Sequence, residues 1–341
     1  KFIKVSLYMT TIIAEAGINH NGNIQTAFKL IDVAVKAKAD IIKFQTFKSI
    51  DLATPNAEKV KYQKKNGDPS ESQQKMLRNL ELTYEEHIKL MLYCQKKNIE
   101  FLSTPFDMES VNFLNTLNMK RWKIPSGEIT NIPFIRLISS LGKPIILSTG
   151  MSKLSEIAKA LEILQSQGIS KDNITVLQCT TSYPTPMNQV NLRAMNTIAN
   201  TFGVKVGFSD HTSEVFTPIA AVALGASVIE KHFTLNKNME GPDHKASLEP
   251  EELELMIKGI RDIEKSLGDG IKRPLECELE NIKTARKSIV ASRSIKKGEI
   301  FSANNLTAKR PGYGISPLHW DDLLDRKSSR DYDQDELIEW S

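Results

Sequence analysis

The stretch GFSDHTSEVFTPIAAVALGASVIEKHFT, residues 207–234, decides how the chain is expected to fold. Two short apolar runs each end in a histidine, His211 and His232, and a small-residue segment with helical spacing lies between them. A strand, a helix and a second strand in this order form a βαβ unit, in which the strands run parallel. The stretch therefore predicts that both imidazoles lie at the carboxyl ends of two consecutive strands.

The same alternation of apolar runs and helical segments begins at Thr11. The runs are TIIAEAG, DIIKFQTF, EFLSTPF, RWKIPSG, PIILSTG, ITVLQCTTSYP, KVGFSDHT and SVIEKHFT. Eight such units in about 260 residues match the size of a (β/α)8 TIM barrel, an α/β fold. An open doubly wound sheet is the alternative, although no GxGxxG motif follows the first run to favour it.

We expect three parts in the chain: a barrel over residues 9–268, a linker over 269–285 and a small domain over 286–341. The linker is charged and has no strand pattern, whereas SIVASRSIKKGEIFSANNLTAKRPGYGIS contains short strands separated by turn signals. A polar, lysine-rich insertion, Lys48 to Thr83, follows the second strand. On a barrel it would lie at the catalytic face, either as a lid or as a solvated loop.

Charge and composition exclude several classes of protein. The 45 basic and 41 acidic residues are spread along the chain, which is not the pattern of a nucleic-acid-binding protein. The cysteines Cys94, Cys179 and Cys277 have no paired spacing, so a reducing, cytoplasmic environment is expected. The longest uncharged apolar run, residues 218–229, is shorter than the roughly 18 residues of a membrane span. Residues 1–8 are too short for a signal peptide.

Polar side chains gather where the predicted strands end, and in a barrel enzyme this is the catalytic face. They include Glu15, Asn19, His20, Lys43, Gln45, Ser103, Thr104, Lys123, Ser126, Glu128, Ser148, Thr149, Thr180, Thr181, Ser182, Tyr183, Ser209, Asp210, His211, Glu230 and His232. One strand-end histidine or buried lysine commonly has only a structural role. So many polar groups at one rim would be costly to bury without a function.

Two kinds of chemistry are indicated at this rim. His211 and His232 suit a catalytic divalent metal with open positions. Lysines and hydroxyls at the other strand ends would form a basic, donor-rich pocket for a phosphate and a carboxylate. A nucleoside triphosphate is not expected, because no P-loop motif is present.

Several motifs together resemble the N-acetylneuraminate (sialic acid) synthase family. They are IIAEAGINHNG, KFQTFK, LSTPFD, KIPSGEITNIP, ILSTGM, CTTSYPTP, FSDHT, EKHFT and GPDHKASLEP, and the tail IKKGEIFSANNLTAKRPGYGIS is similar to that family's antifreeze-like (SAF) domain. The resemblance implies condensation of phosphoenolpyruvate with an N-acetylated hexose, N-acetylmannosamine, and water to give N-acetylneuraminate and phosphate. It also implies a divalent metal, Mn2+ or Mg2+, and a domain-swapped homodimer. From charge and hydropathy, neither nucleic acid nor membrane is expected as a partner.

The resemblance also assigns roles to single residues. It implies that Glu15 is the catalytic carboxylate and that His211 and His232 are metal ligands. The phosphoenolpyruvate pocket would be formed by Lys43, Thr104, Lys123, Ser126 and Ser148. The sugar would be bound by Gln45, Tyr183, Glu230 and Asp243, and by Arg310 from the SAF domain of a partner subunit. Ser182 stands where many relatives have glutamate, and residues 323–341 lack the usual glycine-lysine after the leucine pair.

Three alternatives remain open at this point. A legionaminate-type synthase would run the same reaction on a diacetamido-trideoxyhexose. A Schiff-base aldolase would use Lys43 or Lys123 as its nucleophile. A non-catalytic carbohydrate-binding protein would use the SAF domain alone.

Overall fold

The computed structural model describes residues 9–60, 63–64 and 70–340, so residues 1–8 lie outside the described ranges. The chain divides into two compact units, one running to Asp269 and the other beginning at Gly270. Within the described ranges, no helix is long and apolar enough to cross a membrane.

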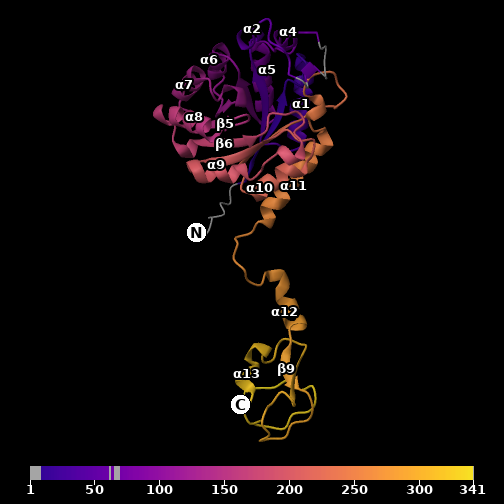
Figure 1. The fold of residues 1–341 in the computed structure, drawn as a ribbon. Coiled ribbons are helices and arrows are strands. Elements are labelled where there is room, and N and C mark those ends of the chain that lie inside the picture. Colours follow the sequence, from indigo (N-terminus) through magenta and orange to yellow (C-terminus); the bar gives the residue numbers. More distant parts are fainter. Residues whose placement is uncertain (1–8, 61–62, 65–69, 341) are drawn as a thin grey trace. The chain divides into compact units, whose positions relative to one another are not determined.

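The first unit is a near-closed barrel, which confirms the predicted fold class (Figure 1). Its described part contains eight parallel strands in the order β3-β2-β1-β8-β7-β6-β5-β4. The strands are β1 (Thr11–Gly17), β2 (Ile41–Thr46), β3 (Glu100–Pro105), β4 (Trp122–Ile124), β5 (Ile145–Ser148), β6 (Ile174–Cys179), β7 (Lys205–Asp210) and β8 (Val228–His232). All eight begin within the runs that the sequence predicts to be strands.

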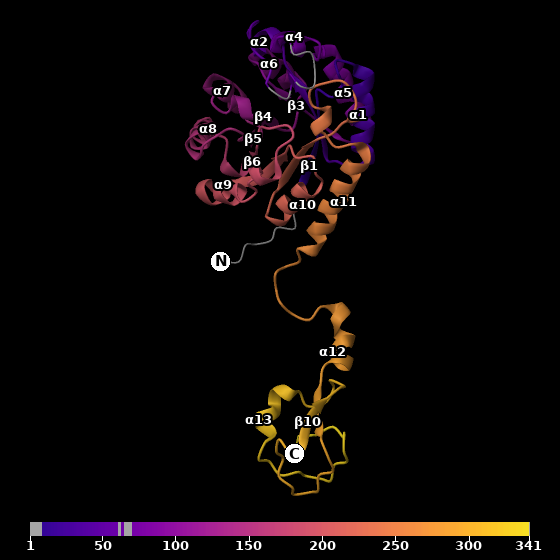
Figure 2. The ribbon, with the colours of Figure 1, turned by 45° about the vertical axis from the view of Figure 1, so that its right-hand side comes forward.

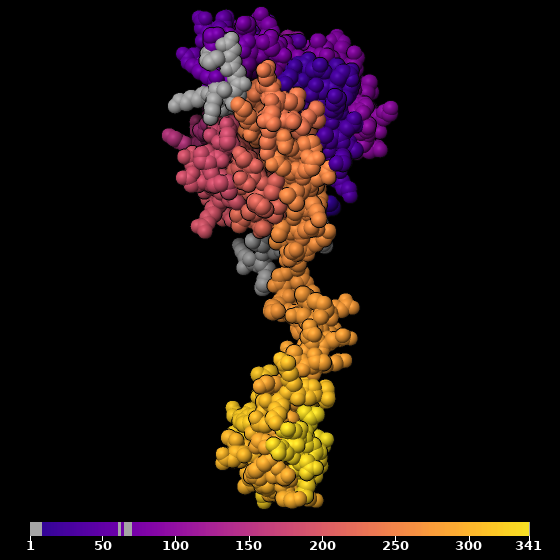
Figure 3. All heavy atoms as spheres, turned by 90° about the vertical axis from the view of Figure 1, so that its right-hand side faces the viewer, coloured from indigo at the N-terminus to yellow at the C-terminus, as the bar shows by residue number. Residues whose placement is uncertain are grey.

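Helices cover the outside of the barrel (Figure 2). They are α1 (Ile24–Lys36), α5 (Tyr84–Lys96), α6 (Met108–Thr116), α7 (Ile132–Ser140), α8 (Leu154–Ser166), α9 (Ala194–Phe202), α10 (Phe216–Ala223) and α11 (Pro250–Ser266). Figure 3 shows the atoms of α11, in orange, beside the indigo N-terminal atoms, and α11 contacts α1. The last barrel helix therefore packs against the first.

Capping residues fix where helices begin, and one glycine fixes how closely two strands approach. Asn23 caps α1 by accepting hydrogen bonds from the backbone amides of Gln25 and Thr26. Thr83 and Glu86 form a reciprocal capping box at the start of α5. In β7, an added Cβ on Gly207 would lie 2.4 Å from the carbonyl oxygen of Val228, so glycine allows β7 and β8 to approach.

Strand register places the polar residues that form the site. Ser209 lies opposite Glu230, and Glu15 lies opposite both Lys43 and His232. Because side chains alternate between the two faces of a strand, residues two apart face the same way. The barrel interior below them is apolar, with Ile13, Leu102 and Leu177 each 0% exposed.

The insertion after β2 is partly structured. It contains α2 (Ser49–Leu52) and α4 (Gln73–Arg78), while residues 61–62 and 65–69 lie outside the described ranges. Met76, Leu77 and Leu80 pack against Ile18 and Phe47 in a small apolar cluster. The insertion is therefore anchored to the barrel rim at its C-terminal end.

The second unit contains short helical segments and a small antiparallel sheet. The expected linker, residues 269–285, contains a 3-10 turn, η5 (Glu276–Glu278), and helix α12 (Leu279–Ala285), so it is not a simple coil. The small domain contains an antiparallel pair, β9 (Ser288–Ala291) and β10 (Leu306–Lys309), followed by η6 (Pro317–His319) and α13 (Trp320–Leu323). Its divergent C-terminal residues are packed, since Tyr332 and Ile338 lie in its apolar core.

Candidate active site

One cavity of about 580 Å³ collects most of the predicted site residues. It lies where the barrel strands end, and its lining includes Glu15, Lys43, Gln45, Thr104, Lys123, Ser126, Ser148, Tyr183, His211, Glu230 and His232. Each of these side chains comes from a strand or from the residues just after one. The structure therefore brings together what the sequence places at the separate strand ends.

Two lysines and two carboxylates lie together inside this cavity. Lys43 Nζ is 2.7 Å from Glu15 Oε2, and it donates to Thr104 Oγ1 at 2.9 Å. Glu230 lies between the lysines, with Lys43 Nζ and Lys123 Nζ each 3.5 Å from one of its oxygens. All four ionisable side chains are almost fully buried. Such burial is costly for stability, so a binding or catalytic role is favoured.

The two carboxyl groups differ in protonation because their neighbours differ. Burial raises the pKa of Glu15 to about 7, with Lys43 and Lys123 opposing it. Burial also disfavours the charged form of Glu230, but Lys123 and Lys43 outweigh it and lower its pKa to about 2. Near pH 7, Glu15 can therefore give or take a proton, whereas Glu230 stays ionised.

The two histidines lie at the ends of β7 and β8, and His232 is the register partner of Glu15. His211 Nδ1 donates to the carbonyl oxygen of Thr180 at 2.7 Å, which leaves the Nε2 lone pair free to bind a ligand. The rings of His211 and His232 have centroids 5.6 Å apart. Burial lowers the pKa of both imidazoles, and His211 lowers that of His232 further, so both rings are neutral.

These histidines fit a divalent ion that keeps open positions. His232 Nδ1 is buried and has no hydrogen-bond partner among the described residues, as expected of a group that awaits a ligand. The described residues contain no group of three or more histidine, cysteine, aspartate or glutamate side chains that could hold a metal. Two histidine ligands would leave the other positions of an ion for water or substrate oxygens.

Hydroxyl groups and a close backbone define the end of the cavity beside β4 and β5. The backbone amide of Gly150 donates to Ser126 Oγ at 2.9 Å, and Ser148 Oγ is buried with no described partner. An added Cβ on Gly150 would lie 2.1 Å from Thr181 Oγ1 and 2.9 Å from Ser126 Oγ. Only glycine leaves this space open, and its hydroxyl lining suits phosphate oxygens.

Some lining residues were not predicted. Cys179 lines the cavity, with its Sγ 3.2 Å from Ser126 Oγ. Its position at the end of β6, two residues after Leu177, would have identified it. Val60, Gln63 and Gln73 of the insertion also line the cavity, which favours a wall or lid over a purely solvated loop.

Two predicted sugar-binding residues do not line this cavity. Asp243 is buried in the loop after β8, where its carbonyl accepts a hydrogen bond from Ser247 Oγ at 2.7 Å. Asn19 holds the same loop by donating to Ser247 Oγ at 2.9 Å. Arg310 is exposed in the second unit, and its Nε donates to the carbonyl oxygen of Ala285 at 3.0 Å. The roles proposed for both residues remain predictions.

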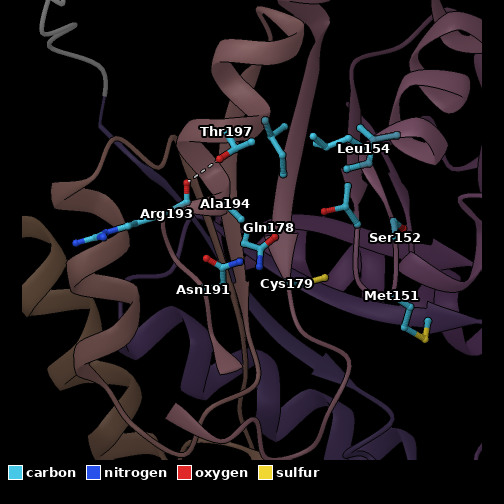
Figure 4. Close-up of a pocket in the computed structure, with 12 residues that line it drawn as sticks. Met151, Ser152, Leu154, Gln178, Cys179, Asn191, Arg193, Ala194 and Thr197 are labelled. Atoms are coloured by element: carbon cyan, nitrogen blue, oxygen red, sulfur yellow. Dashed lines mark hydrogen bonds between the residues drawn. The ribbon is translucent and has the colours of Figure 1, made fainter. Parts of the chain in front are cut away.

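A second pocket of about 390 Å³ lies outside the barrel wall, between α8 and α9 (Figure 4). Its lining includes Gln178, Asn191 and Leu154, and it shares Met151 and Cys179 with the larger cavity. The Arg193 side chain extends away from the other labelled side chains. This pocket lacks the cluster of buried charges that distinguishes the larger cavity.

The chain is similar to known proteins along most of its length. The NeuB family model matches residues 30–272, and the SAF domain model matches residues 286–341. An N,N'-diacetyllegionaminic acid synthase of Campylobacter jejuni is 53% identical over 96% of this chain and 98% of its own. One of Legionella pneumophila is 43% identical, over 96% and 93% of the two chains.

A solved structure gives the same picture of the fold. The N-acetylneuraminic acid (sialic acid) synthetase of Leptospira borgpetersenii aligns with a TM-score of 0.71 at 34% identity. The alignment covers 81% of this chain and 91% of the synthetase.

Proposed function

The chain belongs to the NeuB family, and on that premise we propose that it is a nonulosonate synthase whose product is a legionaminic acid. It is an enzyme that forms a carbon–carbon bond between phosphoenolpyruvate and a sugar, with water as co-substrate and phosphate as the second product. The acceptor is an open-chain diacetamido-trideoxyhexose. The single observation that carries the reaction is the cavity that Lys43, Lys123 and Glu15 line together with His211 and His232.

The choice of sugar departs from the first expectation. The motifs favoured N-acetylmannosamine as acceptor, with legionaminate synthesis as the alternative. The alternative is better supported, because identity is 53% with a legionaminic acid synthase and 34% with the solved sialic acid synthetase. Ser182, which stands where many relatives have glutamate, also lines the cavity.

The mechanism follows from the positions of the buried groups. Lys43, Lys123 and the nearby hydroxyls bind the phosphate and carboxylate of phosphoenolpyruvate through charge-assisted hydrogen bonds. Carbon 3 of phosphoenolpyruvate attacks the sugar aldehyde, and water adds at carbon 2, where positive charge develops. The tetrahedral product then loses phosphate. Glu15, with its pKa raised to about 7 by burial, exchanges a proton with the sugar oxygen or the attacking water.

A divalent ion, Mn2+ or Mg2+, is the proposed cofactor. His211 and His232 would hold it, and when bound it supplies Lewis-acid polarisation of the aldehyde. The support is the pair of neutral imidazoles and the Nδ1 of His232, which has no hydrogen-bond partner in the part of the chain that the structure describes.

The rival reading as a Schiff-base aldolase is weaker at Lys43. Glu15 and Glu230 outweigh burial and raise the pKa of Lys43, which keeps this amine protonated and poorly nucleophilic. Lys123 differs, because burial lowers its pKa. Borohydride reduction in the presence of pyruvate tests both lysines, since a metal-assisted synthase forms no imine and retains full activity.

Acceptor preference is the direct test of the proposed function. With phosphoenolpyruvate and Mn2+, the diacetamido-trideoxyhexose should give a kcat/KM for phosphate release at least about tenfold above that for N-acetylmannosamine. This is the discrimination that one or two altered substituents provide in a pocket, about 1–3 kcal/mol. Preference for N-acetylmannosamine would instead indicate a sialic acid synthase. No phosphate release with any N-acylated hexose would refute the proposal that the protein is a nonulosonate synthase.

We further propose a homodimer in which Arg310 completes the sugar site of the partner. The support is the family resemblance, the exposure of Arg310, and a guanidinium that keeps its charge and can donate to an amide carbonyl. Mixing the inactive variants Arg310→Ala and Glu15→Ala under subunit exchange should restore activity, because one site of each mixed dimer has both residues intact. Demonstrated mixed dimers without activity would show that each chain completes its own site.

A further inference from the structure

A fully buried ion pair lies directly behind the two histidines. Asp210 and Lys231 are register partners on β7 and β8, and both side chains are 0% exposed. Lys231 Nζ lies 2.6 Å from Asp210 Oδ2. Each residue precedes one of the histidines in sequence, so alternation along a strand directs the pair to the face opposite the cavity.

The ion pair also binds Thr212, the residue that follows His211. Lys231 Nζ donates to the carbonyl oxygen of Thr212 as well as to Asp210. Asp210 accepts from the Thr212 backbone amide at 2.9 Å and from Thr212 Oγ1 at 3.0 Å. The Lys231 ammonium group therefore binds both sequence neighbours of His211, Asp210 and Thr212. Lys231 itself directly precedes His232.

Stability alone does not explain such a pair. Taking two charges out of water is costly, and well-packed apolar residues in their place are often neutral or stabilising. Directional contacts offer something that apolar packing does not, which is a defined register and spacing between two strands. In metal sites, groups behind the ligands commonly fix ligand orientation and affect affinity.

We propose that Lys231 and Asp210 are positioning residues for the metal centre, which set the separation and orientation of the His211 and His232 imidazoles. The proposal rests on the proposed function, because it takes the two histidines as metal ligands. It assigns a role to two residues that touch neither substrate nor ion. The inward contact between Ser209 Oγ and Glu230 Oε1, at 3.0 Å, ties the same strands from the cavity side.

The decisive variant removes both charges together. Asp210→Asn combined with Lys231→Met keeps the approximate shapes and leaves no unpaired buried charge, so the full-length protein should remain folded. We expect its Kd for Mn2+, measured by titration without substrates, to rise about 10–100-fold, the usual effect of losing groups behind a ligand. The absorption spectrum of the Co2+-loaded protein, which reports ligand geometry, should also change.

A matched control separates positioning from general destabilisation. Arg261→Met breaks an ion pair with Asp40, 2.8 Å in length, beside the amino end of the barrel strands. It should lower the unfolding temperature but leave the Mn2+ Kd and the Co2+ spectrum as in the wild type.

The possible outcomes test the positioning role separately from the proposed synthase function. A folded double variant with wild-type Mn2+ affinity and Co2+ spectrum overturns the positioning role, while wild-type phosphate release still supports the synthase. A wild-type protein that binds no Mn2+ overturns both the positioning role and the metal centre. If the double variant does not fold, the isosteric Asp210→Asn decides, because it removes the negative charge of the ion pair and keeps the shape of the side chain. Unchanged affinity and spectrum in that variant also overturn the proposal.

Discussion

Alanine in place of His211 or His232 is expected to reduce kcat by at least about a thousandfold. Lewis-acid stabilisation contributes several kcal/mol to the transition state, and each 1.4 kcal/mol or so corresponds to a factor of ten in rate. The remaining imidazole would have to hold the ion alone. Phosphate release by the Mn2+-supplemented variants is the measurement, with circular dichroism to establish that the fold is retained.

An exposed histidine in the other unit provides the control. His319 is 52% exposed and pairs with Asp322, so His319→Ala should retain wild-type turnover. Chelation by EDTA should inactivate the wild type, and added Mn2+ should restore it. Full turnover by EDTA-treated protein without added metal would contradict the assignment of both histidines.

Methionine in place of Lys43 is expected to have the second largest effect. A charge-assisted hydrogen bond contributes about 1.5–3 kcal/mol, so the KM for phosphoenolpyruvate should rise roughly ten- to hundredfold from this loss alone. The Lys43 charge also lowers the pKa of Glu15, and its removal would shift Glu15 further toward the protonated form. We therefore expect kcat to fall as well, so that kcat/KM drops by more than about a hundredfold.

Lys123 is the matched comparison. Its Nζ lies 3.5 Å from Glu230, whereas Lys43 pairs with both Glu15 and Glu230. Lys123→Met should raise the KM for phosphoenolpyruvate by a similar roughly ten- to hundredfold factor, with a smaller change in kcat. Steady-state kinetics at varied phosphoenolpyruvate and saturating sugar separates the change in KM from the change in kcat. An unchanged KM in both variants would show that neither lysine binds phosphoenolpyruvate.

The barrel and the rim of the site were predictable from local pattern. Short apolar runs separated by helical segments identify parallel strands, and parallel strands in a barrel end at the same face. Residues such as Glu15 and Lys43 could be assigned to that face from their places at the ends of the runs. Alternation along β8 also separated Glu230 and His232 from Lys231.

Other features depend on contacts between segments distant in sequence. Val60 and Gln73 were part of an insertion that could have been solvated, and they line the cavity. Loops and linkers carry weak periodicity, so their structure is determined by what they pack against.

The sequence by itself placed most of the lining residues at the face where the barrel strands end, because period and strand ends are local properties. Only the tertiary structure decided the distances and charges around each residue there. Glu15 and Glu230 are indistinguishable as inward glutamates, yet their pKa values move in opposite directions because Glu230 lies between two lysines. Lys231, which faces away from the cavity, acquires its partner Asp210 from the register of β7 against β8. Burial, distance and register are set by the closed barrel, and electrostatic interactions depend on all three.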